Sequence, residues 1–147
     1  MTKLGASGIL VRDGREFLLG RREAKDEALP GMWCTPGGGV EEGEAINAAI
    51  AREFREETGL IVSVGSLVAV TERFSERGHS VLVFKQVHLK TDTKPIVGEG
   101  FDQIKWFSAS ELAQVDGTGT VTPATEEAIW AFMRTSMFTA VPYDARQ

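Results

Sequence analysis

Three glutamates on one predicted helix, Glu53, Glu56 and Glu57, are the residues of this chain best suited to chemistry. Their i, i+3 and i+4 spacing brings the side chains together on one side of an α-helix. On a helical wheel they continue the stripe of Ile46 and Ile50, which is the natural inward face. Like charges repel at these spacings, and the negative end of the helix dipole disfavours anions. A bound divalent cation would resolve this conflict.

The three carboxylates favour Mg²⁺, with Mn²⁺ as the alternative, because hard oxygen ligands suit these ions better than zinc. The two histidines, His79 and His88, have no ligand-like spacing. The wheel places Arg52 on the Glu56 side of the acidic stripe and directs Arg55 away from it. The alternative interpretation is a solvated acidic helix end, which is common in soluble proteins. The stripe that the glutamates share with isoleucines argues against that alternative.

The segment from Gly38 to Leu60 resembles the box of the Nudix hydrolases. The fixed Gly, Glu and Arg positions of the box occur at the separations of that family: Gly38, Glu44, Arg52-Glu53-Phe54, Glu56-Glu57 and Gly59-Leu60. The one departure is Phe54, where the family usually has an aliphatic residue. The resemblance implies an α/β fold, a Nudix-type α/β/α sandwich in which helices enclose a mixed sheet.

Metal-binding and catalytic roles follow from the resemblance, residue by residue. It implies that Glu53, Glu56 and Glu57 bind Mg²⁺, and that the carbonyl of Gly38 supplies another oxygen. A glycine there lets the backbone approach closely, since no Cβ obstructs it. The resemblance further implies that two box residues support these ligands, Arg52 by orienting the glutamates and Glu44 by bracing the loop.

A general base is also required, and in this family its identity varies. The candidates are a box glutamate, with Glu53 first, and an acid farther along the chain. Glu99, which lies between Gly98 and Gly100 on a predicted loop, is the leading downstream candidate and also a candidate metal ligand, ahead of Asp102. An exposed loop charge is the ordinary alternative for Glu99.

Two arginines and three aromatic residues are candidates for binding the substrate. Arg21 and Arg22 follow a predicted strand, and one of them can clamp phosphates with its planar set of donors. Strand alternation puts the two on opposite faces without saying which faces the site. Trp33, Phe74 and Trp106 offer stacking surfaces for a base, although large aromatics in a small domain often belong to the core.

The elements that position these residues follow from apolar runs and turn signals. Asp13-Gly14 between two apolar runs predicts a hairpin. Residues 21–39 read as one long loop, and Gly59 ends a helix over residues 45–58. Further strands are expected over 61–74, 80–89 and 104–107, then a short helix capped by Ser108 and Glu111, and a helix from Thr122-Pro123 toward Met137. Residues 143–147 are expected to fray.

Composition indicates one globular domain over residues 1–147 and excludes several classes of function. The formal charge of −5 argues against nonspecific nucleic-acid binding, which needs a basic face. Cys34 is the only cysteine, so no intramolecular disulfide can form. No stretch approaches the roughly 20 apolar residues of a membrane span, and we expect a cytoplasmic protein. Its state is monomeric or homodimeric.

The predicted activity is hydrolysis of a diphosphate linkage in a nucleoside diphosphate derivative, a small-molecule nucleotide. A nucleoside triphosphate, cleaved to a monophosphate and pyrophosphate, is the first hypothesis because the chain is short. The enzymatic alternatives are ADP-ribose, a nucleotide sugar or a dinucleoside polyphosphate; Glu76, Arg77 and Gly78 stand where some of these subfamilies carry a proline or tyrosine. A noncatalytic nucleotide sensor is the alternative from another class.

Overall fold

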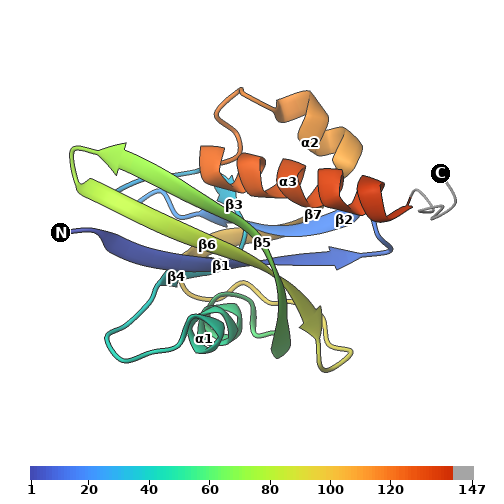
Figure 1. The fold of residues 1–147 in the computed structure, drawn as a ribbon, viewed down its shortest axis with the longest axis horizontal. Coiled ribbons are helices and arrows are strands. Elements are labelled where there is room, and N and C mark those ends of the chain that lie inside the picture. The colour runs from blue at the N-terminus through green and yellow to red at the C-terminus, as the bar shows by residue number, and fades with distance from the viewer. Residues whose placement is uncertain (141–147) are drawn as a thin grey trace, which may run out of the picture.

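The computed structural model describes residues 1–140, in which a mixed sheet lies between helices (Figure 1). The expected fraying of residues 143–147 lies outside the described part of the chain. No helix within that part is long and apolar enough to cross a membrane. The elements in chain order are β1 (Lys3–Arg12), β2 (Glu16–Arg22), β3 (Trp33–Cys34), β4 (Gly37–Gly39), α1 (Ile46–Thr58), β5 (Val62–Ser75), β6 (Gly78–Leu89), β7 (Phe101–Ser108), α2 (Ala109–Val115) and α3 (Pro123–Ala140).

Strand β1 is the centre of the sheet. It runs parallel to β6 and antiparallel to β2 and β4, and β5 continues the sheet beyond β6. The predicted hairpin between β1 and β2 is confirmed, since Asp13 and Gly14 have φ values of 51° and 69°. A tight hairpin turn requires positive φ at both central residues, which explains this dipeptide.

Helix α1 covers one face of the sheet with a small apolar core. Ile50 and Phe54 are fully buried against residues of β1, β2 and β6. Gly8 on β1 makes room for Phe54, because a Cβ at Gly8 would lie 2.5 Å from the Phe54 ring. The aromatic ring at position 54 therefore fills space that the glycine leaves open. Gly59 ends the helix in the left-handed region, as its position in the sequence predicts.

Helix α3 lies on the opposite face, with α2 beside it (Figure 1). Ile129 of α3 packs with Phe17, Phe84 and Phe107 of the sheet. The predicted capping box of α2 is present: Glu111 N donates to Ser108 Oγ at 3.0 Å, and Ser108 N donates to Glu111 Oε1 at 3.3 Å. The predicted α/β sandwich with a mixed sheet is confirmed.

The segment predicted as one long loop, residues 21–39, contains more order than its sequence indicates. It begins inside β2 and includes two short strands, β3 and β4. The three glycines of β4 pair with Gly5, Ala6 and Ser7 of β1. No apolar alternation marks such a strand, since glycines carry no side chains, and the prediction of continuous loop was wrong for this reason.

Candidate active site

The buried residues of α1 fix the position of its acidic stripe, the side chains of Glu53, Glu56 and Glu57. Glu53, Glu56 and Glu57 are all half-buried, whereas Arg55 is exposed, as the wheel predicts. The apolar side chains of Ile50 and Phe54 fix the rotation of the helix against the sheet. The carboxylates are therefore held at the edge of the core, where each charge costs more than it would in water.

Arg52 connects most of these acids. Its Nε and Nη2 donate to the two carboxylate oxygens of Glu44, at 2.8 and 2.9 Å. Its Nη1 donates to Glu53 at 3.0 Å and to Glu56 at 3.3 Å, and Nη2 also reaches the carbonyl of Gly39 at 3.0 Å. Hydrogen bonds from Arg52 lower the pKa of Glu44 to about 2. The wheel placed Arg52 beside Glu56 alone, and this was wrong because a long side chain reaches beyond its own angular position.

Glu57 is the most perturbed carboxyl group of the site. Burial, and then the neighbouring charge of Glu53, raise its pKa to about 9. The backbone N–H of Gly37 donates to Glu57 Oε1 at 2.8 Å and partly opposes that shift. Burial also raises the pKa of Glu53, against the influence of Arg52. The site thus contains two carboxyl groups that lack sufficient positive charge around them.

The glycines of β4 form the wall beside these carboxylates. A Cβ at Gly38 would lie 2.6 Å from Glu53 Oε1, and one at Gly37 would lie 2.5 Å from the carbonyl oxygen of Ala6. No residue with a side chain fits at either position without a shift. The Cα of Gly38 therefore lies close to the carboxylate of Glu53.

A second backbone segment, residues 96–100, supports the C-terminal end of α1; we call it the strap. The amide groups of Ile96, Gly98 and Glu99 donate to the carbonyls of Thr58, Glu57 and Glu56 at 2.9, 2.8 and 3.0 Å. These carbonyls have no partners within the helix, so the strap satisfies them. It also brings Glu99 next to the helix end, and a Cβ at Gly100 would lie 3.7 Å from Glu57 Oε2.

The Gly98→Ala substitution is expected to destabilise the protein by about 1–3 kcal/mol, because an added methyl group must displace packed atoms. A Cβ at Gly98 would lie 2.2 Å from the carbonyl oxygen of Glu56, which is backbone and cannot turn away. Urea denaturation measures the loss. Gly39→Ala is the matched control, since a Cβ there meets nothing within 4 Å. Equal stability of the two variants would contradict the proposed role of the strap.

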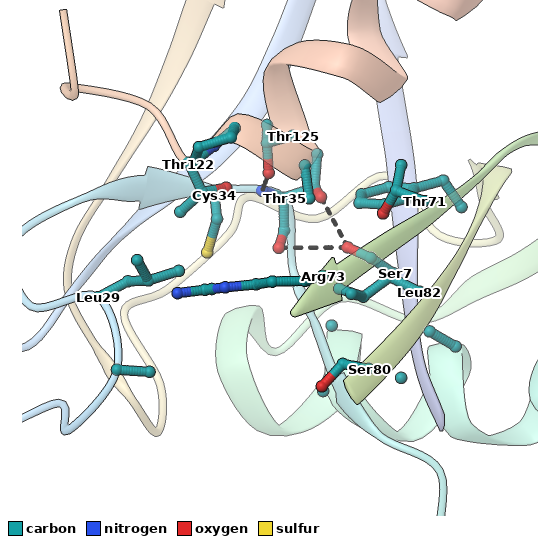
Figure 2. A pocket seen from close by; sticks show the side chains of 18 of the residues that line it. Ser7, Leu29, Cys34, Thr35, Thr71, Arg73, Ser80, Leu82, Thr122 and Thr125 are labelled. Carbon is teal, nitrogen blue, oxygen red and sulfur yellow. Dashed lines mark hydrogen bonds between the residues drawn. The ribbon is translucent and has the colours of Figure 1, made fainter. Parts of the chain in front are cut away.

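A pocket of about 520 Å³ adjoins the glycine wall on the α3 side of the sheet (Figure 2). Its lining comes from β1, β4, β5 and β6, from the end of β2, β3 and the loop between them, and from the start of α3. Ser7 lies at its inner end, where its hydroxyl donates to the Pro36 carbonyl at 2.7 Å and bonds Thr35 Oγ1 at 2.6 Å. Thr35 N donates to Thr125 Oγ1 of α3 at 3.2 Å. Small polar side chains therefore line an otherwise largely apolar cavity.

Of the two predicted arginines, Arg22 lines the pocket and Arg21 does not. Arg22 Nη2 donates to Asp26 at 2.7 Å, and Nη1 lies 3.8 Å from the buried sulfur of Cys34. The guanidinium of Arg21 lies over the Trp33 ring, 5.9 Å from its centroid, and its Nε pairs with Asp102 at 2.6 Å. Asp102 is thereby engaged away from the carboxylates of α1.

The three predicted stacking aromatics do not line the pocket. Trp33 packs edge-on against Phe107 at 5.0 Å between ring centroids, in the core on the α3 side. Trp106 lies on the other side, beneath the guanidinium of Arg12. Phe74 is 76% exposed and stacks on His79 at 4.4 Å. Residue type suggested these candidates, but strand register decides which face each side chain occupies.

Three residues of β5 line the pocket, Thr71, Glu72 and Arg73, and the first and last of them carry no signal in the sequence. Both lie on the pocket side of the strand, because residues two apart share a face. Figure 2 shows the guanidinium of Arg73 extended across the pocket toward Leu29. Only the pairing of β5 with β6 brings these residues to the pocket, so pattern alone could not identify them.

Comparison with known proteins agrees with this arrangement of helix, glycine wall and pocket. The model of the NUDIX domain matches residues 1–126, which include the box and most of the pocket. The chain belongs to the Nudix family. The rest of the chain consists of residues 127–147, most of which continue α3.

Three similar proteins illustrate the range of this Nudix relationship. An ADP-ribose pyrophosphatase of Methanocaldococcus jannaschii is 37% identical over 82 residues, which span 54% of this chain and 47% of that protein. The nucleoside triphosphatase NudI of Klebsiella pneumoniae is 29% identical over 119 residues, 73% of this chain and 83% of the relative. The crystal structure of a MutT NUDIX hydrolase from Burkholderia pseudomallei has a TM-score of 0.74 at 28% identity, covering 89% and 98% of the two chains.

The Nudix box residues fit a divalent cation chemically. They offer hard oxygen ligands, and the raised pKa of the buried Glu57 indicates a shortage of positive charge at that point. Within residues 1–140 the structure gathers no three acidic, His or Cys side chains into a ready metal site. Arg52 and the Gly37 amide hold the carboxylates instead. The side chains must therefore turn when a cation binds.

The metal-free Nudix domain is expected to lose stability as the pH rises from about 5 to 9. The folded-state pKa of Glu57, about 9, exceeds its ordinary value of 4.5, so the folded state binds more protons across this window. Glu44, whose pKa is lowered, makes the stability rise with pH, but only between about pH 2 and pH 4.5. Melting temperatures measured across this range in EDTA and in Mg²⁺ test the expectation. The melting temperature should fall less with pH in Mg²⁺, because the ion binds the charged form of Glu57. Parallel curves of melting temperature against pH in the two solutions would contradict the expectation.

Proposed function

We propose that this Nudix protein hydrolyses nucleoside triphosphates to nucleoside monophosphates and pyrophosphate, with Mg²⁺ as cofactor. The observation that carries the proposal is that the pocket and the acidic helix share one wall, the glycines of β4. A ligand seated in the pocket would extend its phosphates along this wall toward Glu53. Mn²⁺ is the alternative ion because it accepts the same oxygen ligands.

Each box residue has a role in this proposal. Glu53, Glu56, Glu57 and the carbonyl of Gly38 would hold the metal. When bound, the metal would offset phosphate charge and lower the pKa of a water molecule. Arg52 orients Glu53 and Glu56 through its hydrogen bonds, and Glu44 fixes the guanidinium of Arg52.

The proton of the attacking water would be accepted by Glu53 or Glu99. Glu53 is half-buried and touches Arg52, whereas Glu99 extends from the strap beside the end of α1. Glu99 also offers a further carboxylate to the metal. At the pocket, Arg22 is the residue proposed to contact the substrate phosphates, because Asp26 holds its guanidinium at the lining.

The pocket suits a nucleoside in size and polarity. A cavity of about 520 Å³ lies within the usual range of roughly 300–1,000 Å³ for small-molecule sites. Its lining combines apolar residues and hydroxyl groups, which suit a neutral base, with charged side chains such as Arg22 and Arg73, which suit phosphate oxygens. The alignment with the NudI relative, whose name states nucleoside triphosphatase activity, covers a larger share of that relative than the alignment with the ADP-ribose pyrophosphatase covers of that enzyme. ADP-ribose is the second candidate because that relative is the more identical one.

The test is a panel of nucleoside triphosphates, ADP-ribose, nucleotide sugars and dinucleoside polyphosphates, assayed with Mg²⁺ in ¹⁸O-labelled water. Pyrophosphate release from triphosphates alone, with the label in one product, supports the proposal and identifies the phosphorus atom that is attacked. Turnover of ADP-ribose alone would favour the second candidate. Tight nucleotide binding without hydrolysis of any compound would indicate a sensor instead.

A further inference from the structure

Two buried polar atoms of the described residues have no hydrogen-bond partner, Thr71 Oγ1 and Arg22 Nε. Both residues line the same pocket. Thr71 is 2% exposed, so its hydroxyl has been removed from water without a protein partner in return. Such burial costs stability, and folded proteins rarely accept it without a reason. The hydroxyl itself has almost no accessible surface, so the Thr71 side chain must rotate about its Cα–Cβ bond before a ligand in the pocket can supply the partner.

Thr71 stands at the end of a row of paired residues that crosses the sheet. Gly39 pairs with Gly5, Gly5 with Leu82, and Leu82 with Thr71. All four residues line the pocket. The two glycines carry no side chains, so the end of the row near the Nudix box has free space above the backbone. At the opposite end the side chains of Leu82 and Thr71 line the pocket. A flat, elongated ligand can lie along it.

The length of this row indicates which part of a ligand reaches Thr71. Three strand spacings of about 4.8 Å separate the strand of Gly39 from that of Thr71, roughly 14 Å in all. A phosphate beside Glu53 cannot extend so far. The group that meets Thr71 is therefore the opposite end of the molecule, which in a nucleotide is the base.

We propose that Thr71 is a specificity-determining residue whose hydroxyl hydrogen-bonds a polar group on the edge of the nucleobase. This inference rests on the proposed function, since it takes the ligand to be a nucleotide. The neutral hydroxyl both donates and accepts, so it suits a base carbonyl or amino group. A site built around such a bond discriminates against a base that lacks the group, because the buried hydroxyl is then left unpaired.

The test compares Thr71→Val, which keeps the shape and removes the hydroxyl, with Thr71→Ser, which keeps the hydroxyl. For the preferred triphosphate, Thr71→Val should raise KM about tenfold, the value of one hydrogen bond, and change kcat less than twofold. Thr71→Ser should restore KM. The ligand-free Thr71→Val protein should also melt at a higher temperature, because an unpaired buried hydroxyl has been removed.

Thr58→Val is the control for that increase in melting temperature. Its buried hydroxyl is satisfied, since it donates to Phe54 O at 2.6 Å and accepts from Leu60 N at 3.2 Å, so its removal should lower the melting temperature. A lower melting temperature for Thr71→Val, with KM unchanged for every base, would overturn the proposal. That result would show a purely structural hydroxyl.

A binding measurement separates this inference from the proposed hydrolysis. The dissociation constants of the same triphosphates are measured by calorimetry in Glu57→Gln protein, with and without Thr71→Val. Tenfold weaker binding with valine supports the role of Thr71 even when no triphosphate is hydrolysed. Equal binding overturns that role although hydrolysis stands, and no binding of any nucleotide overturns both.

Discussion

The Glu57→Gln variant is expected to retain the fold and to lose about 10²–10³-fold in kcat, the size of effect that follows removal of a preorganised charge. Glutamine preserves the shape and can still accept the Gly37 amide, but it cannot supply a negative charge. Burial and the neighbouring charge of Glu53 raise the pKa of Glu57 to about 9, so its carboxyl group is protonated near neutral pH until a bound cation stabilises the charged form. Initial rates with saturating substrate, measured over a range of Mg²⁺ concentrations, test this expectation.

Glu42→Gln is the matched control for the loss of charge. Glu42 is exposed and lies in the same box, before the helix begins. Its replacement should change kcat less than twofold. In EDTA at about pH 8, Glu57→Gln should also melt at a higher temperature than the parent, because Glu57 must take up a proton when the parent folds and the neutral amide has no such cost. Full activity in Glu57→Gln would exclude this glutamate from the reaction.

Arg52→Lys is expected to lower kcat about 10–100-fold, as is usual for residues that orient metal ligands. Lysine keeps the positive charge but has one nitrogen, whereas the guanidinium binds Glu44, Glu53, Glu56 and the Gly39 carbonyl at the same time. The carboxylates should therefore lose their relative orientation. The apparent Mg²⁺ affinity, obtained from activity titrations, should fall together with kcat.

Arg55→Lys is the control for this substitution, because Arg55 is exposed on the same helix and points away from the stripe. It should leave both quantities unchanged. If Arg52→Lys behaved like Arg55→Lys, the charge of Arg52 would matter and its geometry would not. If both variants lost activity, general destabilisation of α1 would be the cause, and thermal denaturation would reveal it.

The local parts of this site could be predicted because their signals lie close together in the sequence. The stripe of Glu53, Glu56 and Glu57 follows from helix periodicity, and the end of the helix follows from Gly59. The hairpin at Asp13-Gly14 depends on only two residues. In each case the local structure is determined by residues within a few positions of one another, and the folded protein keeps that local structure.

The pocket could not be predicted, because its walls meet only through strand register. Thr71 reaches the pocket through its pairing with Leu82, and Thr125 through the docking of α3. Periodicity identifies the alternation of a strand but not which of its faces meets a cavity. Because strand register could not be predicted, the aromatic candidates were chosen by residue type alone. In the structure, Trp33 and Trp106 lie on opposite sides of the sheet.

The strap has a consequence for how the acidic helix survives between catalytic cycles. Three amide groups direct their partial positive charges at the last carbonyls of α1, where the helix dipole is most negative. The field that opposes Glu56 and Glu57 is therefore weakened by the backbone itself, independently of any cation. We expect the helix to remain wound when product and metal depart, so that only the carboxylate side chains, and not the backbone of α1, have to move when the next substrate arrives.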